Sequence, residues 1–115
     1  MGSELDLRRL TELQQILGAG LPEIVTTLID ELTTATAQIE TSIAGGDLPS
    51  AALAAHAARN SALMLDANPL LDALREIESG ASHDDAPRVH AGLGRLRSSW
   101  PALRSQLQAA AQLPT

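Results

Sequence analysis

Residues 21–49 read LPEIVTTLIDELTTATAQIETSIAGGDLP, a segment that specifies two helices and the turn between them. Apolar residues recur every three or four positions in its first part, which predicts a helix with one buried stripe from Pro22 to Ala44. That stripe consists of Ile24, Leu28, Leu32, Ala35, Ile39 and Ile43. Gly45 and Gly46 suit the end of a helix and Asp47 suits the N-cap of the next, so we expect a helical hairpin.

The rest of the chain also favours helix, because Ala and Leu are abundant while β-branched and aromatic residues are scarce. Turn residues divide it into further helices, which we expect at residues 6–17, 48–65, 69–79 and 85–111. Gly80 closes the helix that Asn68 caps, and Asp84 or Asp85 caps the last helix. Connections of a few residues make neighbouring helices antiparallel. The predicted fold class is all-α: an antiparallel up-and-down four-helix bundle with a short extra N-terminal helix.

Trp100 and Pro101 fall inside the last predicted helix. A proline in the interior of a helix removes a backbone hydrogen bond and bends or breaks the helix. The apolar rhythm continues on both sides of it, so we expect a kink and not an end. The residues that carry this rhythm are Val89, Leu93, Leu96, Trp100, Leu103 and Leu107.

Length and composition limit the class of protein. With 115 residues, of which 44% are hydrophobic, the chain can close one core, and we expect a single domain over residues 4–115. We interpret residues 1–3, Met1-Gly2-Ser3, as a cloning remnant, which would make the chain an excised piece of a longer protein.

The charge and the residue types argue against several functions. A net charge of −6 is unsuited to binding nucleic acid, and one aromatic residue leaves little for bases to stack on. The lack of cysteine excludes a disulfide framework and a thiolate zinc site. There is no apolar run long enough for a membrane span and no signal peptide. We therefore expect a cytoplasmic protein or the cytoplasmic end of a membrane-bound sensor, without membrane contact of its own and monomeric.

The helix predicted at residues 48–65 has two apolar faces. One is a stripe of mostly small residues that suits close packing: Leu48, Ala51, Ala55, Ala58, Ala62 and Leu65. The other places His56 and Asn60 between Leu53 and Leu63, with Arg59 beside them. This second face is either buried, with His56 a hydrogen-bonded core histidine, or an exposed docking patch with a reactive imidazole at its centre. Arg59, three residues after the histidine, favours the docking patch because it could neutralise an anion held on the ring.

The segment from Leu21 to Glu78 contains His56-Ala57-Ala58-Arg59-Asn60-Ser61-Ala62, followed by Asp66-Ala67, with Gly46-Asp47 upstream and Ile77-Glu78 downstream. In these residues it resembles a histidine-phosphotransfer domain, the phosphocarrier module of multistep two-component phosphorelays. Arg59 stands where the family has Lys and keeps the charge, although a guanidinium is not a point-like ammonium. Asn60 and Asp66 stand where the family has Gly.

The resemblance implies a role for each residue of this face. His56 is the phosphoacceptor, which takes a phosphoryl group from a phospho-aspartate of a receiver domain and passes it to another receiver. Arg59 stabilises the phosphoryl group, while Asn60 either hydrogen-bonds it or restricts the approach of a receiver. Ala52, Leu53 and Leu63 bind the partner. The implied partners are receiver domains and a sensor kinase, and we expect the terminal domain of a hybrid kinase or a free-standing relay protein.

No cofactor, metal or ATP site is expected in the domain itself, and the resemblance assigns magnesium to the receiver. The sequence has no Gly-rich phosphate loop and no Asp-rich calcium loop. His83 and His90, near Asp84 and Asp85, lack a defined metal-ligand spacing, so we interpret them as solvated. The acidic residues of the second helix, Asp30, Glu31 and Glu40, suit its wet face, and Ser61 is expected on the packed side of its helix.

A second hypothesis stays open beside phosphotransfer. The domain could be a catalytically silent helical module that binds a partner protein through the His56 face. Asn60 favours this hypothesis because its side chain fills a gap through which a partner approaches, whereas Arg59 favours phosphotransfer.

Overall fold

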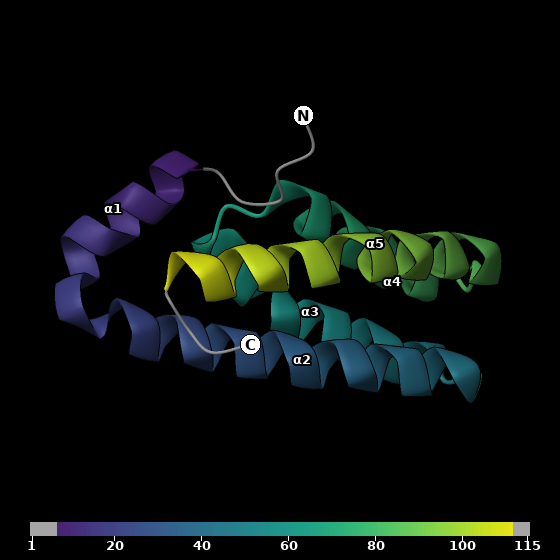
Figure 1. The fold of residues 1–115 in the computed structure, drawn as a ribbon. Helices are drawn as coiled ribbons and strands as arrows, with labels where there is room; N and C mark the ends of the chain where they lie inside the picture. Colours follow the sequence, from purple (N-terminus) through teal and green to yellow (C-terminus); the bar gives the residue numbers. More distant parts are fainter. Residues whose placement is uncertain (1–6, 112–115) are drawn as a thin grey trace.

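The structure, a computed structural model, describes residues 7–111. Its elements are α1 (Leu7–Leu17), a short 3-10 helix η1 (Gly18–Gly20), α2 (Leu21–Ala44), α3 (Leu48–Met64), α4 (Asn68–Ser82) and α5 (Ala86–Ala110) (Figure 1). No strand occurs within these residues, and the predicted all-α class is confirmed. Asp6, the expected first residue of α1, and the interpretation of residues 1–3 as a cloning remnant fall outside the described residues.

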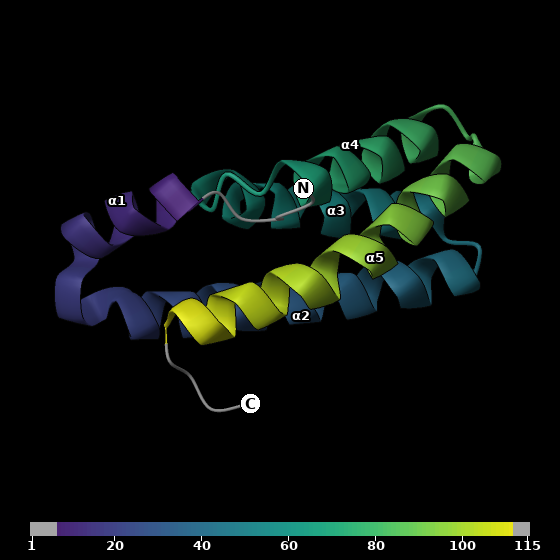
Figure 2. The ribbon, with the colours of Figure 1, turned by 45° about the horizontal axis from the view of Figure 1, so that its top comes forward.

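The helices α2 to α5 form the predicted up-and-down bundle. Each packs against the next, and α5 returns to α2, so the four helices close around one core (Figure 2). Helix α1 folds back from the start of α2 across one end of the bundle (Figure 1). Arg9 Nε donates to the Met64 carbonyl at 2.6 Å, which ties α1 to the last turn of α3. None of the helices in the described range is long and apolar enough to cross a membrane.

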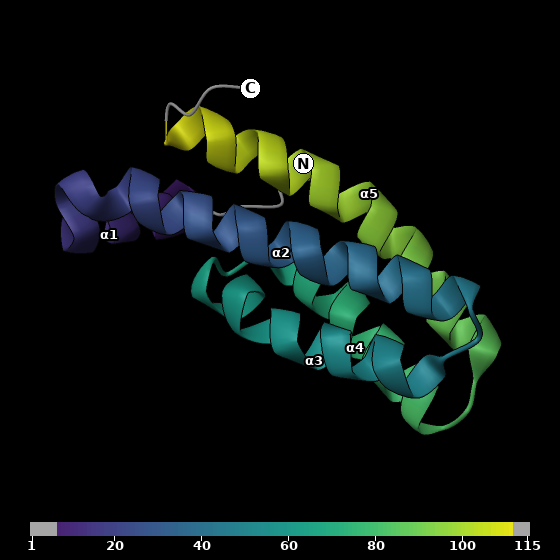
Figure 3. The ribbon, with the colours of Figure 1, turned by 90° about the horizontal axis from the view of Figure 1, so that it is seen from below.

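The core follows the predicted stripes except at Ile24 and at Leu48, which is only partly buried against it. On α2 the stripe is buried from Leu28 onward, but the inclusion of Ile24 is wrong, since that residue is 37% exposed. Val25 and Leu21 occupy the inward positions one and two turns before Leu28 and leave Ile24 on the flank. On α5 all six predicted residues are buried, and the helix continues through Pro101 and curves along its length (Figure 3).

The three connections between bundle helices share one backbone design. Gly46, Asp66 and Asp84 have φ of 73°, 53° and 52°, the left-handed conformation that ends a helix. In each case the next amide donates to a carbonyl five residues back, as in the bond from Asp47 N to Ser42 O at 2.8 Å. The side chain of Asp47 then caps α3 by accepting from Ser50 N at 3.1 Å, and Asp85 caps α5 in the same way.

Two predicted boundaries of α4 are wrong. Asn68 is not the N-cap but the first helical residue, and Ala67 holds the cap position without a side-chain hydrogen bond. Gly80 does not close the helix, which runs on to Ser82. Gly80 is buried where α4 meets α5, and a Cβ atom there would lie 2.9 Å from Cγ2 of Val89. This glycine is therefore required by close helix packing and not by a turn.

Candidate functional site

His56 lies on the outer face of α3, where its side chain is 68% exposed. The interpretation of His56 as a core histidine is therefore wrong. The exposure follows from the sequence of α3, whose small buried residues seat it between α2 and α4 and leave the opposite face to solvent. Leu53 and Leu63 on this face are 73% and 47% exposed, and Met64, which the sequence analysis did not select, is 45% exposed.

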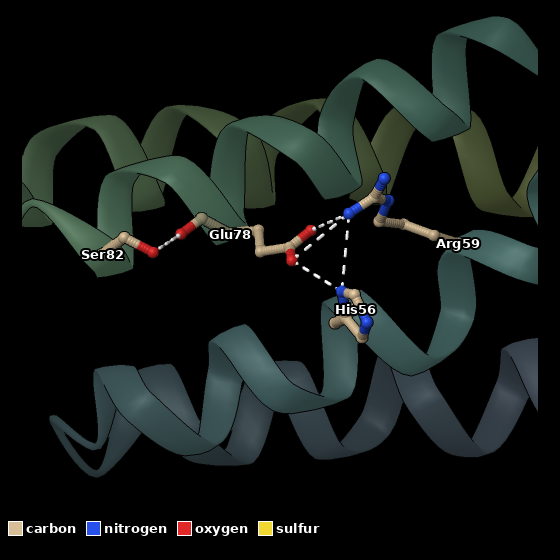
Figure 4. Close-up of polar contacts among 4 residues, drawn as sticks. All are labelled: His56, Arg59, Glu78 and Ser82. Carbon is tan, nitrogen blue, oxygen red and sulfur yellow. Dashed lines mark hydrogen bonds and ion pairs between the residues drawn. The ribbon is translucent and has the colours of Figure 1, made fainter.

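Glu78 of α4 reaches across to His56. The Nδ1 atom of His56 lies 2.8 Å from Oε1 of Glu78, the shortest polar contact of the imidazole (Figure 4). A carboxylate can only accept, so Nδ1 carries the proton and donates a hydrogen bond to Glu78. The second nitrogen, Nε2, is then left with a free lone pair, and it points away from Glu78 (Figure 4). Glu78 thus selects the tautomer whose nucleophilic nitrogen faces solvent.

Arg59 binds the same carboxylate. Its Nη1 atom donates to Oε2 of Glu78 at 3.0 Å and lies 3.3 Å from Oε1. The Nη1 atom also lies 3.4 Å from Nδ1 of His56, but two donors cannot bond to each other, so the carboxylate is the acceptor for both. The Nε atom of Arg59 is buried and has no hydrogen-bond partner in the described part of the chain. The guanidinium is thus held beside the imidazole by the carboxylate that both groups share.

Two hollows flank the His56 face of α3. The one toward α4, of about 490 Å³, is lined by His56 and Glu78 together with Pro49, Ala52, Leu53, Ala81 and Ser82. The one toward α2, of about 660 Å³, is lined by Asn60 among others and by the acidic side chains Asp30 and Glu31. The predicted partner residues Ala52 and Leu53 therefore border the imidazole directly. Leu63 lies about two turns along α3, on the other side of His56.

Asn60 is not brought into the cluster of His56, Arg59 and Glu78. It faces the α2 side, exposed and without a side-chain hydrogen bond within residues 7–111. Ser61 is buried, as expected, and its hydroxyl donates to Oε2 of Glu31 at 2.9 Å. On the wet face of α2, Glu40 pairs with Arg97 of α5 at 2.6 Å.

The other two histidines are exposed, and neither is hydrogen-bonded to His56. His83 lines a hollow that Arg59 and Glu78 also line. Nδ1 of His83 lies 2.8 Å from the Ser79 carbonyl, and His90 lies on α5. Over the described range, no group of three or more His, Asp or Glu side chains is arranged to hold a metal ion.

The model of the Hpt domain family matches residues 23–113, which is most of the chain. The chain belongs to the Hpt domain family. Domains of this family carry out phosphotransfer in phosphorelay signalling and interact with receiver domains, so this chain is assigned to phosphorelay signal transduction. No curated protein and no solved structure matches the chain significantly.

Glu78 is the site residue that the sequence analysis missed. Its place after Ile77 belonged to the pattern that suggested the family, yet no role was assigned to it. The register of the hairpin between α3 and α4 is the signal that pairs Glu78 with His56, because contacts across an antiparallel helix pair join positions at similar distances from the turn.

Proposed function

We propose that His56 is the phosphoacceptor of a phosphorelay and that its Nε2 atom is the nucleophile. The observation that carries the proposal is the hydrogen bond from Nδ1 to Glu78, which leaves Nε2 unprotonated on an exposed surface. A helix surface suffices for this chemistry, since phosphoryl transfer depends mainly on in-line positioning and charge neutralisation.

The transfer step is a displacement at phosphorus. The lone pair of Nε2 attacks the phosphoryl group of a receiver phospho-aspartate, the N–P bond forms, and the P–O bond to the aspartate breaks. The aspartate leaves with the electron pair as a carboxylate. The proton on Nδ1 stays hydrogen-bonded to Glu78, so the ring acquires a positive charge that this carboxylate stabilises. The reverse sequence returns the phosphoryl group to a second receiver.

Arg59 supplies the positive charge on this domain's side of the reaction. It lies one helical turn after His56 and is the cation nearest the imidazole, 3.4 Å from Nδ1 to Nη1. A guanidinium can bind two phosphoryl oxygens at once. Magnesium belongs to the receiver in this proposal, and the domain contributes no metal or cofactor of its own.

The docking surface is the exposed face of α3. Leu53 and Ala52 lie on the α4 side of the imidazole and Leu63 on its C-terminal side, so a receiver that covers His56 buries apolar side chains around the reacting atoms. We further propose that a cytoplasmic sensor kinase feeds the relay, with this monomeric domain at its terminus or free-standing.

Phosphoramidate tests the proposal without a partner protein. Purified wild-type protein is incubated with it, and the adduct is detected by intact mass, with His56→Gln as the test variant and His90→Gln as a matched exposed control on α5. We expect an acid-labile, base-stable adduct on wild type and His90→Gln and none on His56→Gln. An adduct that persists in His56→Gln, or none on any form, rejects His56 as phosphoacceptor.

The silent-module hypothesis rests on Asn60, whose exposed side chain occupies the α2 side of the face. If it obstructs a receiver, Asn60→Gly should raise the rate of transfer from a phosphorylated receiver about fivefold or more. Phosphoramidate is a small molecule that Asn60 does not obstruct, so the rate of phosphorylation by phosphoramidate should stay the same. Equal receiver rates in both forms would show that Asn60 does not hinder docking.

A further inference from the structure

Arg75 is a cation of this region that the proposed mechanism does not use. It lies on α4, three residues before Glu78, and lines a hollow of about 410 Å³ together with Arg59, Glu78, Ser79, Ser82 and His83. The side chain is exposed and makes no ion pair with any described residue. In a chain with a net charge of −6, this arginine thus has no ion-pair partner, although it lines the same hollow as Glu78.

Arg75 has no ion pair with Glu78 because both oxygens of that carboxylate already accept hydrogen bonds. One oxygen accepts from His56 and the other from Arg59, so the carboxylate is already paired when Arg75 comes near it. Positions three apart on a helix share a face, and Arg75 can therefore approach Glu78 along α4. The hairpin register also sets Arg75 level with Arg59, because both line the same hollow from opposite helices.

Phosphorylation of His56 changes which groups pair with Glu78. The new phosphoryl group is attached to Nε2, which points away from Glu78, whereas Arg59 is bound to Glu78 (Figure 4). Arg59 cannot bind both anions fully, and the doubly charged phosphoryl group is the stronger attraction. Once Arg59 turns to it, Glu78 keeps its bond from Nδ1 but loses its guanidinium.

We propose that Arg75 takes the place of Arg59 on Glu78 when His56 is phosphorylated. The inference rests on the proposed function of His56 and adds a positioning residue to it. Arg75 frees Arg59 for the phosphoryl group and keeps the carboxylate neutralised, so the carboxylate does not repel the phosphoryl charge. The phosphorylated cluster consists of the positively charged ring, the doubly negative phosphoryl group, the Glu78 carboxylate, Arg59 and Arg75, and its formal charges sum to zero. Without Arg75 the sum is negative.

The lifetime of the phosphohistidine tests this exchange. Wild type, Arg75→Gln and Arg75→Lys are phosphorylated with phosphoramidate, the donor is removed, and loss of the adduct is followed by intact mass. Arg104→Gln is the matched control, since Arg104 is an exposed arginine on α5, which adds no residue to the site. We expect Arg75→Gln to shorten the lifetime about two- to fivefold, the effect of a partly exposed ion pair, and Arg75→Lys to restore it.

A double variant separates this exchange from general electrostatics. In a Glu78→Gln background the carboxylate is gone, so adding Arg75→Gln should change the lifetime little. Equal lifetimes in wild type and Arg75→Gln, or the same loss with and without Glu78, would overturn the exchange while leaving His56 as the phosphoacceptor. Failure of wild type to form any adduct would overturn the proposed function itself, so the two failures are distinguishable.

Discussion

His56 and Glu78 lie eleven residues before and eleven residues after Ala67, in the turn between α3 and α4, and their side chains meet at 2.8 Å. An antiparallel helical hairpin brings together positions that are equally far from its turn. The same relation holds for Arg59 and Arg75, which lie eight residues from Ala67 on either side. The turn therefore sets the register that places the Glu78 carboxylate against the His56 imidazole.

Replacing Glu78 by Gln should slow phosphorylation of His56 about tenfold or more. The amide can still accept a hydrogen bond, but it no longer favours a proton on Nδ1 by charge, and it leaves Arg59 without its counter-ion. The rate with phosphoramidate and the imidazole tautomer, read from nitrogen chemical shifts, are the two measurements. Glu76→Gln is the control, because Glu76 pairs with Arg95 outside the site. A Glu78→Gln protein with the wild-type rate and tautomer would show that Glu78 does not position the ring.

Most of the fold could be predicted from sequence because periodicity and turn residues agree along the chain. The alanines of α3 and the leucines of α5 predict their buried faces correctly, since a helix of fixed pitch leaves little choice of which side is apolar. The wrong helix end occurred at a glycine, a residue type that can either end a helix or allow two helices to pack closely. Gly80 looks like a helix terminator, but it is a contact point with Val89, and only the neighbouring helix reveals this.

The site was predictable in part for a related reason. His56, Arg59 and the flanking leucines lie on one helix, so their common face follows from spacing alone. Glu78 comes from another helix, and its contact with His56 depends on where the turn ends. That turn uses Asp66 in a left-handed conformation, which glycine adopts more readily, so the sequence signal for its position was weak.

Leu53→Ala should weaken receiver binding about tenfold while leaving the stability of the domain nearly unchanged. Leu53 is 73% exposed beside His56, so its truncation removes apolar contact area from the interface and little from the core. Ile16→Ala is a matched control, because Ile16 is 74% exposed on α1, away from the site. Calorimetric titration with a receiver that phosphorylates the domain gives the affinity. Equal losses in both variants would argue against a docking role for Leu53.

Gly92→Ala should destabilise the fold by about 1–3 kcal/mol, the usual cost of overpacking. A Cβ atom at this position would lie 2.8 Å from Cγ1 of Ile77 and 3.1 Å from its backbone nitrogen, so α4 and α5 would have to move apart. Gly94, two residues along the same helix, has nothing within 4 Å of such a Cβ. Gly94→Ala should therefore stabilise the protein by roughly 0.5–1 kcal/mol through helix propensity. Urea unfolding of both variants measures the two effects, and a Gly92→Ala protein as stable as wild type would contradict the close packing.

The contribution of Asp47 to stability should disappear in acid. Hydrogen bonds from the Ser50 hydroxyl, at 2.6 Å, and from the Ser50 amide lower the pKa of Asp47 below its ordinary value. A carboxyl whose pKa is lower in the folded state stabilises the fold above its unfolded pKa of about 3.9, and that stabilisation is lost as pH falls through the folded value. Asn keeps the capping oxygen but not the charge, so Asp47→Asn should melt below wild type at neutral pH. The gap between the two melting temperatures should narrow as pH falls below about 4, whereas a constant gap would show that the cap acts through geometry alone.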